Sequence, residues 1–421
     1  MNLTDRDLKV IWHPYTQMKT ALPPVPIVRG EGVCLFDENG KKYIDAVSSW
    51  WVNIHGHAHP YIAQKVSEQL KKLEHVIFAG FTHEGAVELA ERLLPILPGN
   101  QQKVFYSDNG STAVEVAIKM CLQYWHNKGE NRTKIIAFKN AYHGDTFGAM
   151  AVSGRSAFTA AFDSLLFEVE FIDLPDESNV ENLKSQISNL KSNAACFIFE
   201  PLVQGAGGMI MYEAQYLNQL MARCREEGVL MIADEIFTGF GRTGKPFACN
   251  HVSEQPDIMC FSKGLTGGTM ALGLTTCTQN IYDAFLSDDR LKTLFHGHSF
   301  TANPVACAAA LASLDLFLEP ETSENIKRIE SMHKQFAIKI KDHPKIKTIR
   351  QTGTILAMEW QTGNDTSYFN SLRDTLYSYF LEACIILRPL GNTIYILPPY
   401  CITDAQLTYV YSKIEQALEE I

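Results

Sequence analysis

The feature that most constrains the fold of this chain is the unbroken apolar run at residues 229–233, which ends in Asp234 and Glu235. An apolar run of strand length suits the middle of a parallel sheet covered by helices. Ligands of such sheets gather at the carboxyl ends of the strands, where Asp234 would lie. A second apolar run, residues 258–261, precedes Lys263, which follows Asp234 by 29 residues. We therefore expect Asp234 and Lys263 at the same edge of one sheet.

A carboxylate and a lysine at one sheet edge suit the chemistry of pyridoxal phosphate. A lysine amine forms a Schiff base with the aldehyde of this cofactor, and an aspartate partners its pyridinium nitrogen. Asp234 and Lys263 alone could equally be a helix cap and a surface lysine. The choice between these interpretations depends on the rest of the chain.

Composition narrows the class of protein. A chain of 421 residues can bury a large core and is long enough for two domains. Its formal net charge of −10 argues against nucleic acid or an anionic membrane as the main partner. The N-terminus lacks the regions of a signal peptide, and the longest uncharged stretches are too polar to span a bilayer. With ten scattered cysteines and no C-x-x-C pair, we expect a soluble, cytoplasmic protein without a disulfide framework.

The order of the elements predicts an α/β fold. Apolar strands alternate with helical stretches between about residues 103 and 300, which is typical of a mostly parallel sheet covered by helices. Residues 306–421 mix long helices with short strands, as in a smaller α+β domain. Residues 1–50 contain an extended or irregular arm followed by a hairpin turning at Asn39-Gly40. We expect this N-terminal part to join the smaller domain, with residues 51–305 forming the larger one.

Two loops at predicted strand ends could bind a phosphorylated cofactor. Gly110 and Ser111 stand where a strand meets an amphipathic helix, and the free N–H groups of such a helix start favour a phosphate. Thr112 and Glu115 fit a capping box there, so an ordinary capped helix is the alternative. Tyr142 follows the strand at 134–138 and could stack on a planar ring or be a half-buried loop tyrosine.

Two further features have competing interpretations. His55, His57 and His59 alternate in a glycine-containing loop with no acidic ligand nearby, which is poor geometry for zinc, so we expect no metal site. Arg388 ends a short apolar run. It could clamp a carboxylate with two hydrogen bonds or pair with a structural acid.

Taken together, these motifs resemble the class III (ω-type) aminotransferases of fold type I, over nearly the whole chain. The resemblance is carried by residues 107–111, 142–144, 234–244, 262–264 and 296–300, followed by Asn303-Pro304. Residues 12–18 and 48–57 further resemble the branch that acts in biotin biosynthesis. That branch implies ping-pong transamination of 8-amino-7-oxononanoate, with S-adenosylmethionine as the amino donor, in a homodimer with shared active sites.

The resemblance also implies roles for individual residues. Lys263 is similar to the Schiff-base lysine, Asp234 to the partner of the pyridine nitrogen, and Tyr142 to the aromatic residue that stacks on the ring. Gly110 and Ser111 resemble the phosphate cradle, and His298 and Ser299 the segment that reaches the phosphate from the other subunit, where the family commonly has Pro-Thr. Tyr15, Trp50, Gly297 and Arg388 match substrate contacts, with Trp51 a weaker candidate.

The sequence leaves two rival functions open. The first is another class III aminotransferase that uses a diamine, ornithine or lysine as donor. The second is a pyridoxal-phosphate-binding protein without catalytic activity. Residues 12–18 and the Trp50-Trp51 pair argue against the first, and the intact pair of Lys263 and Asp234 argues against the second.

Overall fold

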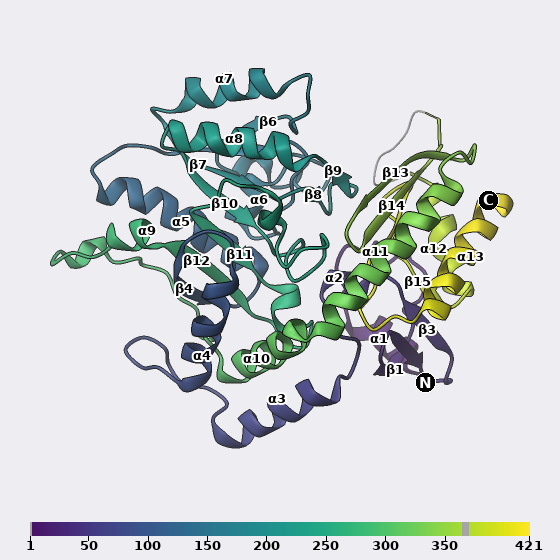
Figure 1. Cartoon of the computed structure of the whole chain (residues 1–421). Coiled ribbons are helices and arrows are strands. Elements are labelled where there is room, and N and C mark those ends of the chain that lie inside the picture. The colour runs from purple at the N-terminus through teal and green to yellow at the C-terminus, as the bar shows by residue number, and fades with distance from the viewer. Residues whose placement is uncertain (1, 364–369) are drawn as a thin grey trace.

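The computed structural model describes residues 2–363 and 370–421, and a seven-stranded sheet lies at the centre of its larger half (Figure 1). The strands follow the order β4 (Gln101–Ser107), β12 (Gly273–Thr278), β11 (Ile258–Phe261), β10 (Leu230–Asp234), β7 (Ala194–Phe199), β5 (Lys134–Phe138) and β6 (Glu170–Ile172). Neighbours from β11 to β6 are parallel, whereas β12 runs antiparallel to both β11 and β4. The predicted α/β fold with a mostly parallel sheet is confirmed.

Both faces of this sheet are covered, which explains the unbroken apolar run. Leu230 and Ile232 pack in the hydrophobic cluster that contains the inner face of α5 (Gly110–Asn127). Met231 and Ala233, which alternate with them along β10, pack in the cluster that contains α8 (Ala214–Glu226). Successive side chains of a strand point to opposite faces, so a strand buried on both sides needs apolar residues throughout.

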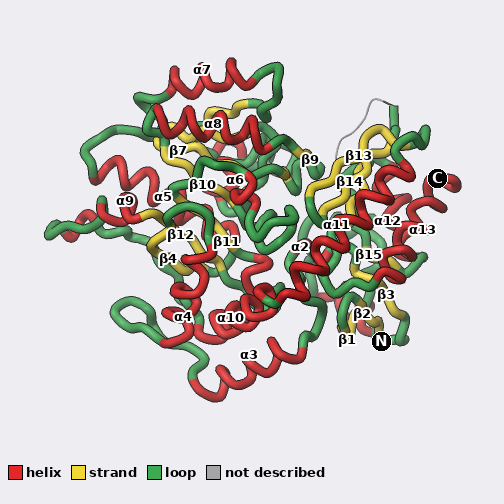
Figure 2. The backbone as a smooth tube through the Cα atoms, in the orientation of Figure 1, coloured by secondary structure: helices red, strands yellow, loops and turns green. Residues whose placement is uncertain are grey.

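The helix α10 (Pro304–Leu318) supports the Lys263 region from below the sheet (Figure 2). It packs against α3 (Pro60–Lys72), α4 (Glu84–Leu93) and the 3-10 turn Lys263–Thr266. The residues of α10 are mostly alanine, leucine and other apolar types on all of its faces, as expected for a helix that is largely buried. The turn that carries Lys263 therefore rests on a rigid, buried element.

The second half of the molecule combines chain segments from both ends. A three-stranded antiparallel sheet joins β13 (Ile346–Thr352), β14 (Ile355–Trp360) and β16 (Thr393–Ile396), with α11 (Pro320–Ile340), α12 (Leu372–Glu382) and α13 (Asp404–Glu420) beside it. A four-stranded sheet joins β1 (Ile27–Glu31), β2 (Cys34–Asp37) and β3 (Lys42–Asp45) to β15 (Ile385–Ile386). Both termini lie in this half (Figure 1). The exact domain limits at residues 50 and 305 stay predictions.

The N-terminal arm differs from the prediction. Residues 1–30 were predicted to form an extended or irregular arm, and most of them do, but the arm begins with the helix α1 (Leu3–Val10). The side chain of Asn2 caps α1 by accepting a hydrogen bond from the N–H of Asp5 at 2.7 Å. An asparagine N-cap followed by an acidic residue in the first turn favours a helix. This local preference explains why a helix forms where an irregular segment was predicted.

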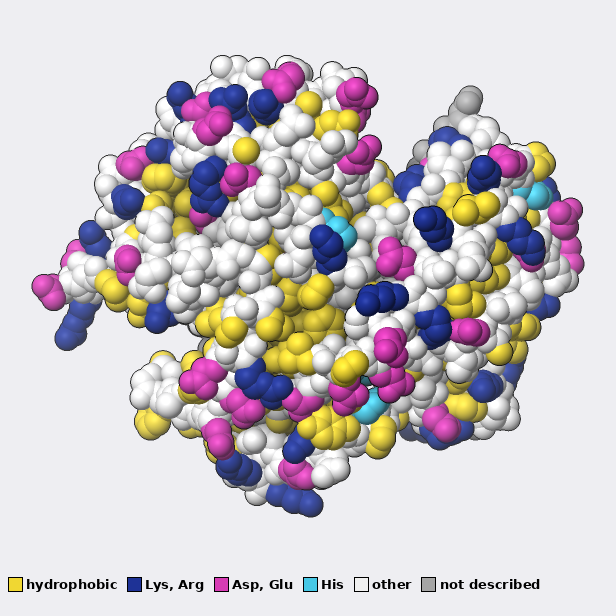
Figure 3. All heavy atoms as spheres, in the orientation of Figure 1, with side chains coloured by type: hydrophobic (Ala, Val, Ile, Leu, Met, Phe, Trp, Pro, Cys, Tyr) yellow, Lys and Arg dark blue, Asp and Glu magenta, His cyan; other side chains and the backbone are white. Residues whose placement is uncertain are grey.

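The remaining elements are short or peripheral: α6 (Phe147–Val152), α7 (Val180–Leu190), α9 (Gln279–Asp283), β8 (Val203–Gln204) and β9 (Ile210–Met211). Among the residues that the structure describes, no helix is both long enough and apolar enough to span a membrane. Basic and acidic side chains are interspersed over the face in Figure 3, and neither sign forms a continuous field there.

Candidate active site

Asp234 and Lys263 lie at the carboxyl ends of two adjacent parallel strands. Asp234 is the last residue of β10 and is paired with Cys260 of β11, and Lys263 follows the end of β11 by two residues. Both belong to the edge of the sheet that was predicted from the two apolar runs. The prediction that the fold brings this carboxylate and this amine to one edge is confirmed by the strand pairing.

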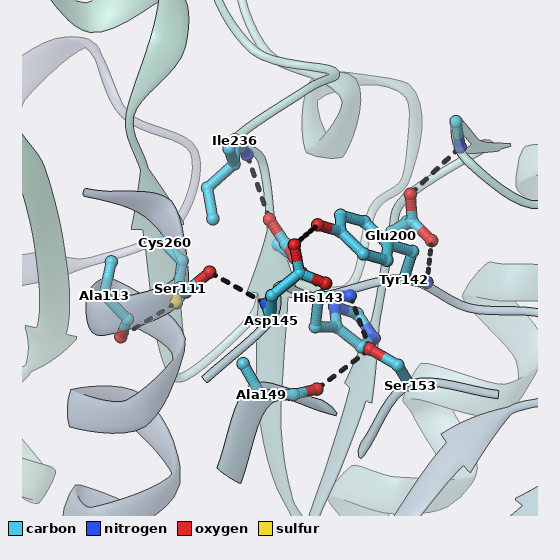
Figure 4. A network of polar contacts seen from close by, with 12 residues as sticks. Ser111, Ala113, Tyr142, His143, Asp145, Ala149, Ser153, Glu200, Ile236 and Cys260 are labelled. Carbon is cyan, nitrogen blue, oxygen red and sulfur yellow. Dashed lines mark hydrogen bonds and ion pairs between the residues drawn. The ribbon is translucent and has the colours of Figure 1, made fainter. Parts of the chain in front are cut away.

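Asp234 is held in its orientation by hydrogen bonds to both of its carboxylate oxygens (Figure 4). One oxygen accepts the N–H of Ile236 at 3.1 Å, and the other accepts Nδ1–H of His143 at 2.7 Å. Asp234 is only 4% exposed and His143 only 2%. The Nε2 atom of His143 is buried without a hydrogen-bond partner among the described residues. A carboxylate so placed can pair with a cationic ring nitrogen, and His143 holds its orientation.

Glu200 is a buried acid of this site that was not predicted. It accepts hydrogen bonds from the N–H of Tyr142 at 2.9 Å and from the N–H of Gly205 at 3.0 Å (Figure 4). Burial raises the pKa of Glu200 to about 7, His143 opposes this rise, and Asp234 adds to it. Glu200 therefore ties the loop that carries Tyr142 to the loop at residue 205.

The Lys263 side chain is a half-buried amine that lies between an aromatic ring and two carboxylates. Burial lowers its pKa, while the carboxylates of Asp234 and Glu200 act in the opposite direction. Its Nζ atom lies 5.1 Å from the centre of the Trp51 ring. It has no hydrogen-bond partner among the described residues. A lysine with a depressed pKa is a nucleophile and a base near neutral pH.

The backbone of Lys263 is strained and is held by its neighbours. Its φ angle is 40°, a left-handed conformation that is uncommon for a residue with a side chain. Ser313 of α10 donates a hydrogen bond to the carbonyl of Gly264 at 3.2 Å, and His55 lies 3.0 Å from the same hydroxyl. Burial lowers the pKa of His55 to about 3, so this histidine is neutral. His55 thus supports the lysine turn.

The first turn of α5 has a different cap from the predicted one. Asn109 is the N-cap: its side chain accepts the N–H of Thr112 at 3.0 Å, and Thr112 accepts the N–H of Asn109 at 3.0 Å. The predicted capping box of Thr112 and Glu115 is therefore wrong. Glu115 instead accepts hydrogen bonds from Thr146 at 2.6 Å and from the N–H of Gly148 at 2.8 Å, at the start of α6.

The start of α5 is shaped as a cradle for an anion. Gly110 lies directly beneath Ile236, since a Cβ atom on Gly110 would stand 3.1 Å from that side chain. The Ser111 hydroxyl accepts the N–H of Asp145 at 3.2 Å. Gly144, with φ of +129°, leaves no room for a side chain, because its Cβ would meet the Ser111 hydroxyl at 2.0 Å. Glycines at these close approaches let the Tyr142–Asp145 loop and Ile236 pack directly against the first turn of this 18-residue helix.

A cavity of about 970 Å³ opens from this edge towards the second half of the molecule. Its lining includes five residues of the predicted site, Tyr15, Trp50, Tyr142, Lys263 and Arg388, together with Trp51. The hydroxyl of Tyr142 donates to Asp145 at 3.0 Å, and the hydroxyl of Tyr15 donates to the same carboxylate. Burial and the bond to Tyr15 raise the pKa of Tyr142. Asp145 was not predicted as part of this network.

Both tryptophans line this cavity because of an unusual backbone turn. The four residues Ser48–Trp51 have φ angles of 52°, 44°, 71° and 73°, all left-handed. Each such residue costs about 1–2 kcal/mol when it is not glycine. A strand would send successive side chains to opposite faces. The left-handed turn instead brings Trp50 and Trp51 to one cavity, so both face it.

Arg388 follows β15 in the second half of the molecule and lines the same cavity as Lys263. Its guanidinium carbon stands 4.6 Å from the centre of the Trp50 ring. The side chain is half-buried and has no ion-pair partner within residues 2–363 and 370–421. Arg388 thus keeps its five N–H donors free for a ligand, which argues against the structural alternative.

The comparisons with known proteins agree with this geometry. The family model described as aminotransferase class III matches residues 15–418. The adenosylmethionine-8-amino-7-oxononanoate aminotransferase of Synechococcus elongatus is 47% identical over 421 residues, covering 98% of this chain and 99% of that protein. The chain belongs to the class III aminotransferases.

Solved structures place this aminotransferase in the same fold. The adenosylmethionine-8-amino-7-oxononanoate aminotransferase from Methanocaldococcus jannaschii matches with a TM-score of 0.95 and 38% identity, covering 99% of this chain and 98% of that one. The omega transaminase from Pseudomonas jessenii in complex with PMP matches with a TM-score of 0.94 and 26% identity, covering 100% and 98%. Fold type I and the use of pyridoxal phosphate, both predicted from the sequence, are confirmed.

The residues of the aminotransferase fit this cofactor. Two buried polar atoms beside the cradle, the Ser107 hydroxyl and one oxygen of Asp108, lack hydrogen-bond partners among the described residues. The buried Nε2 of His143 likewise has none. The start of α5, the carboxylate of Asp234 and the amine of Lys263 are groups of the chemical types that suit a phosphate, a ring nitrogen and an aldehyde.

Three predicted residues of the aminotransferase lie outside the lining of this cavity. Gly297, His298 and Ser299 belong to a loop before α10 in which Gly297 and Ser299 are exposed. His298 lies 2.9 Å from His296 and 3.5 Å from a carboxylate oxygen of Asp108. His298 and Ser299 were predicted to reach the phosphate in the partner's active site, and Gly297 was predicted to contact the substrate; these roles stay predictions.

Proposed function

We propose that this aminotransferase transfers an amino group to the 7-keto group of 8-amino-7-oxononanoate, forming 7,8-diaminononanoate in biotin biosynthesis. The names of its full-length relatives support this acceptor. One observation of the structure carries the proposal: a single cavity is lined both by the amine of Lys263 and by Arg388, which has no ion-pair partner among the described residues. An acceptor with a ketone at one end and a carboxylate at the other suits that arrangement.

Pyridoxal phosphate, when bound, draws electrons from the substrate carbon that carries the amino group. Gly110, Ser111 and the first N–H groups of α5 would hold its phosphate. Tyr142, whose loop is fixed by Glu200, would stack on its ring. Asp234 would pair with the ring nitrogen and keep it protonated, with His143 fixing the carboxylate in place.

Lys263 would move the proton of the reaction. Its Nζ atom would be the group that accepts and returns this proton, and burial lowers the pKa of Lys263, which favours the neutral, basic form of the amine. With the cofactor bound, the Nζ atom of Lys263 would take a proton from the donor carbon that carries the amino group and would give it to the carbon on the other side of that nitrogen. Because the turn under Lys263 is fixed by Gly264 and Ser313, the amine stays within reach of both positions.

The far end of the cavity would bind the acceptor. Tyr15 and Trp50, whose ring centres are 5.6 Å apart, would cover the alkyl chain. Arg388 would grip the carboxylate with two charge-assisted hydrogen bonds. Trp51, beside Lys263, would close the cavity near the reacting carbon.

A steady-state donor screen tests this proposal and separates its alternatives. Purified protein with pyridoxal phosphate is given 8-amino-7-oxononanoate together with S-adenosylmethionine, lysine, ornithine or a diamine, and the diaminononanoate is quantified. We expect product with S-adenosylmethionine. Turnover of amines without amination of this acceptor would indicate another class III activity. An absorbance spectrum that no amine changes would indicate a protein that binds pyridoxal phosphate but has no catalytic activity.

We also propose that the active enzyme is a cytoplasmic homodimer. Ile77, Phe81, Phe295 and Phe300 are 59%, 61%, 65% and 60% exposed, which is high for large apolar side chains. The ring of Phe300 lies 5.3 Å from that of His75, so the two loops that carry these residues adjoin. A second copy covering them would take up Gly297, His298 and Ser299 at its phosphate site. Sedimentation at micromolar concentration tests this, and a monomer with full activity would contradict it.

A further inference from the structure

The left-handed turn Ser48–Trp51 presents its two tryptophans with very different support. Trp51 is 4% exposed, its indole N–H donates to the hydroxyl of Tyr395 at 3.0 Å, and its carbonyl accepts from Arg242 at 3.3 Å. Trp50 is 39% exposed, and its indole N–H has no hydrogen-bond partner among the described residues. The position of the Trp50 ring therefore depends on the backbone that carries it.

One buried carboxylate holds that backbone. Asp45 is fully buried, and one of its oxygens accepts the N–H of Val47 at 3.1 Å. Its other oxygen accepts the hydroxyl of Ser49 at 2.7 Å and lies 2.9 Å from Nε2 of His57. Ser49 is the residue between the anchored start of the turn and the exposed Trp50. The hydroxyl of Ser49 therefore anchors the turn by a side-chain hydrogen bond at the residue whose φ, 44°, is the smallest positive value in the turn.

Trp50 in turn sets the place of Arg388. The guanidinium lies over its ring, and Tyr15 packs against the ring with centroids 5.6 Å apart. Arg388 has no ion-pair partner in the described parts of the chain, so the ring is the contact that orients it. A shift of the turn would move the ring and loosen the guanidinium.

We propose that Ser49, through its hydrogen bond to Asp45, is a positioning residue that fixes Trp50 under Arg388 and so sets selectivity for a carboxylate at the far end of the acceptor. This inference rests on the proposed function of Arg388 in binding the acceptor. Ser49 itself touches neither the acceptor nor the reacting carbon. Its loss should change the preference between acceptors and leave the donor reaction in place.

Two variants at one position separate the hydrogen bond from the backbone conformation. Ser49→Ala removes the hydroxyl and keeps a side chain at positive φ, whereas Ser49→Gly removes the hydroxyl but adopts positive φ without strain. The measured quantity is the ratio of kcat/KM for 8-amino-7-oxononanoate to kcat/KM for its descarboxy analogue. We expect Ser49→Ala to lower this ratio roughly tenfold and Ser49→Gly to lower it less. This order distinguishes the two effects, because replacing a residue by glycine usually destabilises a folded chain more than replacing it by alanine does.

A matched control and two further readouts keep the test decisive. Ser185→Ala in α7 removes a hydroxyl that donates to a carbonyl of its own helix, that of Glu181, at 3.0 Å, and should leave the ratio unchanged. The rate of the donor half-reaction and the visible absorbance of bound cofactor should match wild type in both Ser49 variants. An unchanged ratio in Ser49→Ala, or a lower ratio in Ser49→Gly than in Ser49→Ala, would overturn the proposal.

Crystal structures distinguish failure of this inference from failure of the proposed function. If the wild-type enzyme does not aminate 8-amino-7-oxononanoate, the proposed function is wrong and the kinetic ratio loses its meaning. The position of the Trp50 ring still decides the inference. A ring displaced from Arg388 in Ser49→Ala and retained in Ser49→Gly supports it, and a ring that stays in place in Ser49→Ala refutes it.

Discussion

Replacing Arg388 by alanine removes the group that we propose grips the carboxylate of the acceptor. The guanidinium is half-buried, lies 4.6 Å from the centre of the Trp50 ring, and has no ion-pair partner in the described parts of the chain. Its removal therefore breaks no internal salt bridge there. A charge-assisted, two-bond contact contributes about 1.5–3 kcal/mol. At about 1.4 kcal/mol per factor of ten, kcat/KM for 8-amino-7-oxononanoate should fall roughly ten- to a hundredfold.

The assay compares the two half-reactions and two acceptors. Arg388→Lys should restore part of the loss, since an ammonium cannot reproduce the planar fork. A descarboxy analogue should be a poor substrate of the wild type and indifferent to Arg388→Ala. Arg29→Ala is a matched control, because Arg29 also lies over an aromatic ring, at 3.7 Å from that of Phe36, but does not line the cavity. If Arg388→Ala lowers kcat/KM for the analogue as much as for the natural acceptor, the residue is structural and the reasoning is wrong.

Three further predictions concern the sheet edge. Lys263→Ala should fold with its cofactor site intact but show no turnover, and a surviving Schiff-base absorbance in that variant would identify another lysine as the anchor. Asp234→Asn should raise the activation barrier by about 3–4 kcal/mol and so lower kcat roughly 100- to 1000-fold, because the charge on the ring nitrogen loses its partner. Near-normal turnover in this variant would mean that another residue pairs with the ring nitrogen. The pKa of Glu200 is about 7 in the folded protein and about 4.5 in an ordinary glutamate, so the folded state binds the Glu200 proton more tightly than the unfolded state does. The stability that this proton contributes is therefore lost as pH rises from about 4.5 to 7. Glu200→Gln should therefore gain stability relative to wild type over that range in urea unfolding at several pH values, whereas a constant difference would contradict the assigned pKa.

The sheet and its edge could be predicted from the sequence because strand periodicity and strand ends follow simple rules. The apolar run before Asp234 demanded helices on both faces of β10, and the structure supplies α5 and α8. The same rule would have found Glu200, which directly follows the apolar strand β7. It was missed because a single acid after a strand carries little signal until Tyr142 and Asp234 are placed beside it.

The parts that could not be predicted depend on contacts between distant segments. Local preference disfavours the left-handed turn Ser48–Trp51, which exists because Asp45 and the carbonyl of Leu397 hold it through the hydroxyls of Ser49 and Ser48. The cap of α5 was misassigned because Glu115 is used by α6, a neighbour in space. Such tertiary hydrogen bonds leave no trace in local sequence patterns.

A single-turnover experiment tests the central claim most directly. The purified protein is loaded with one equivalent of pyridoxamine phosphate, freed of excess, and mixed with 8-amino-7-oxononanoate in the absence of any amino donor. We predict close to one equivalent of 7,8-diaminononanoate per active site, with the return of the absorbance of pyridoxal phosphate bound at Lys263. Recovery of unchanged 8-amino-7-oxononanoate from a protein whose cofactor does react with other keto acceptors would contradict the proposed function.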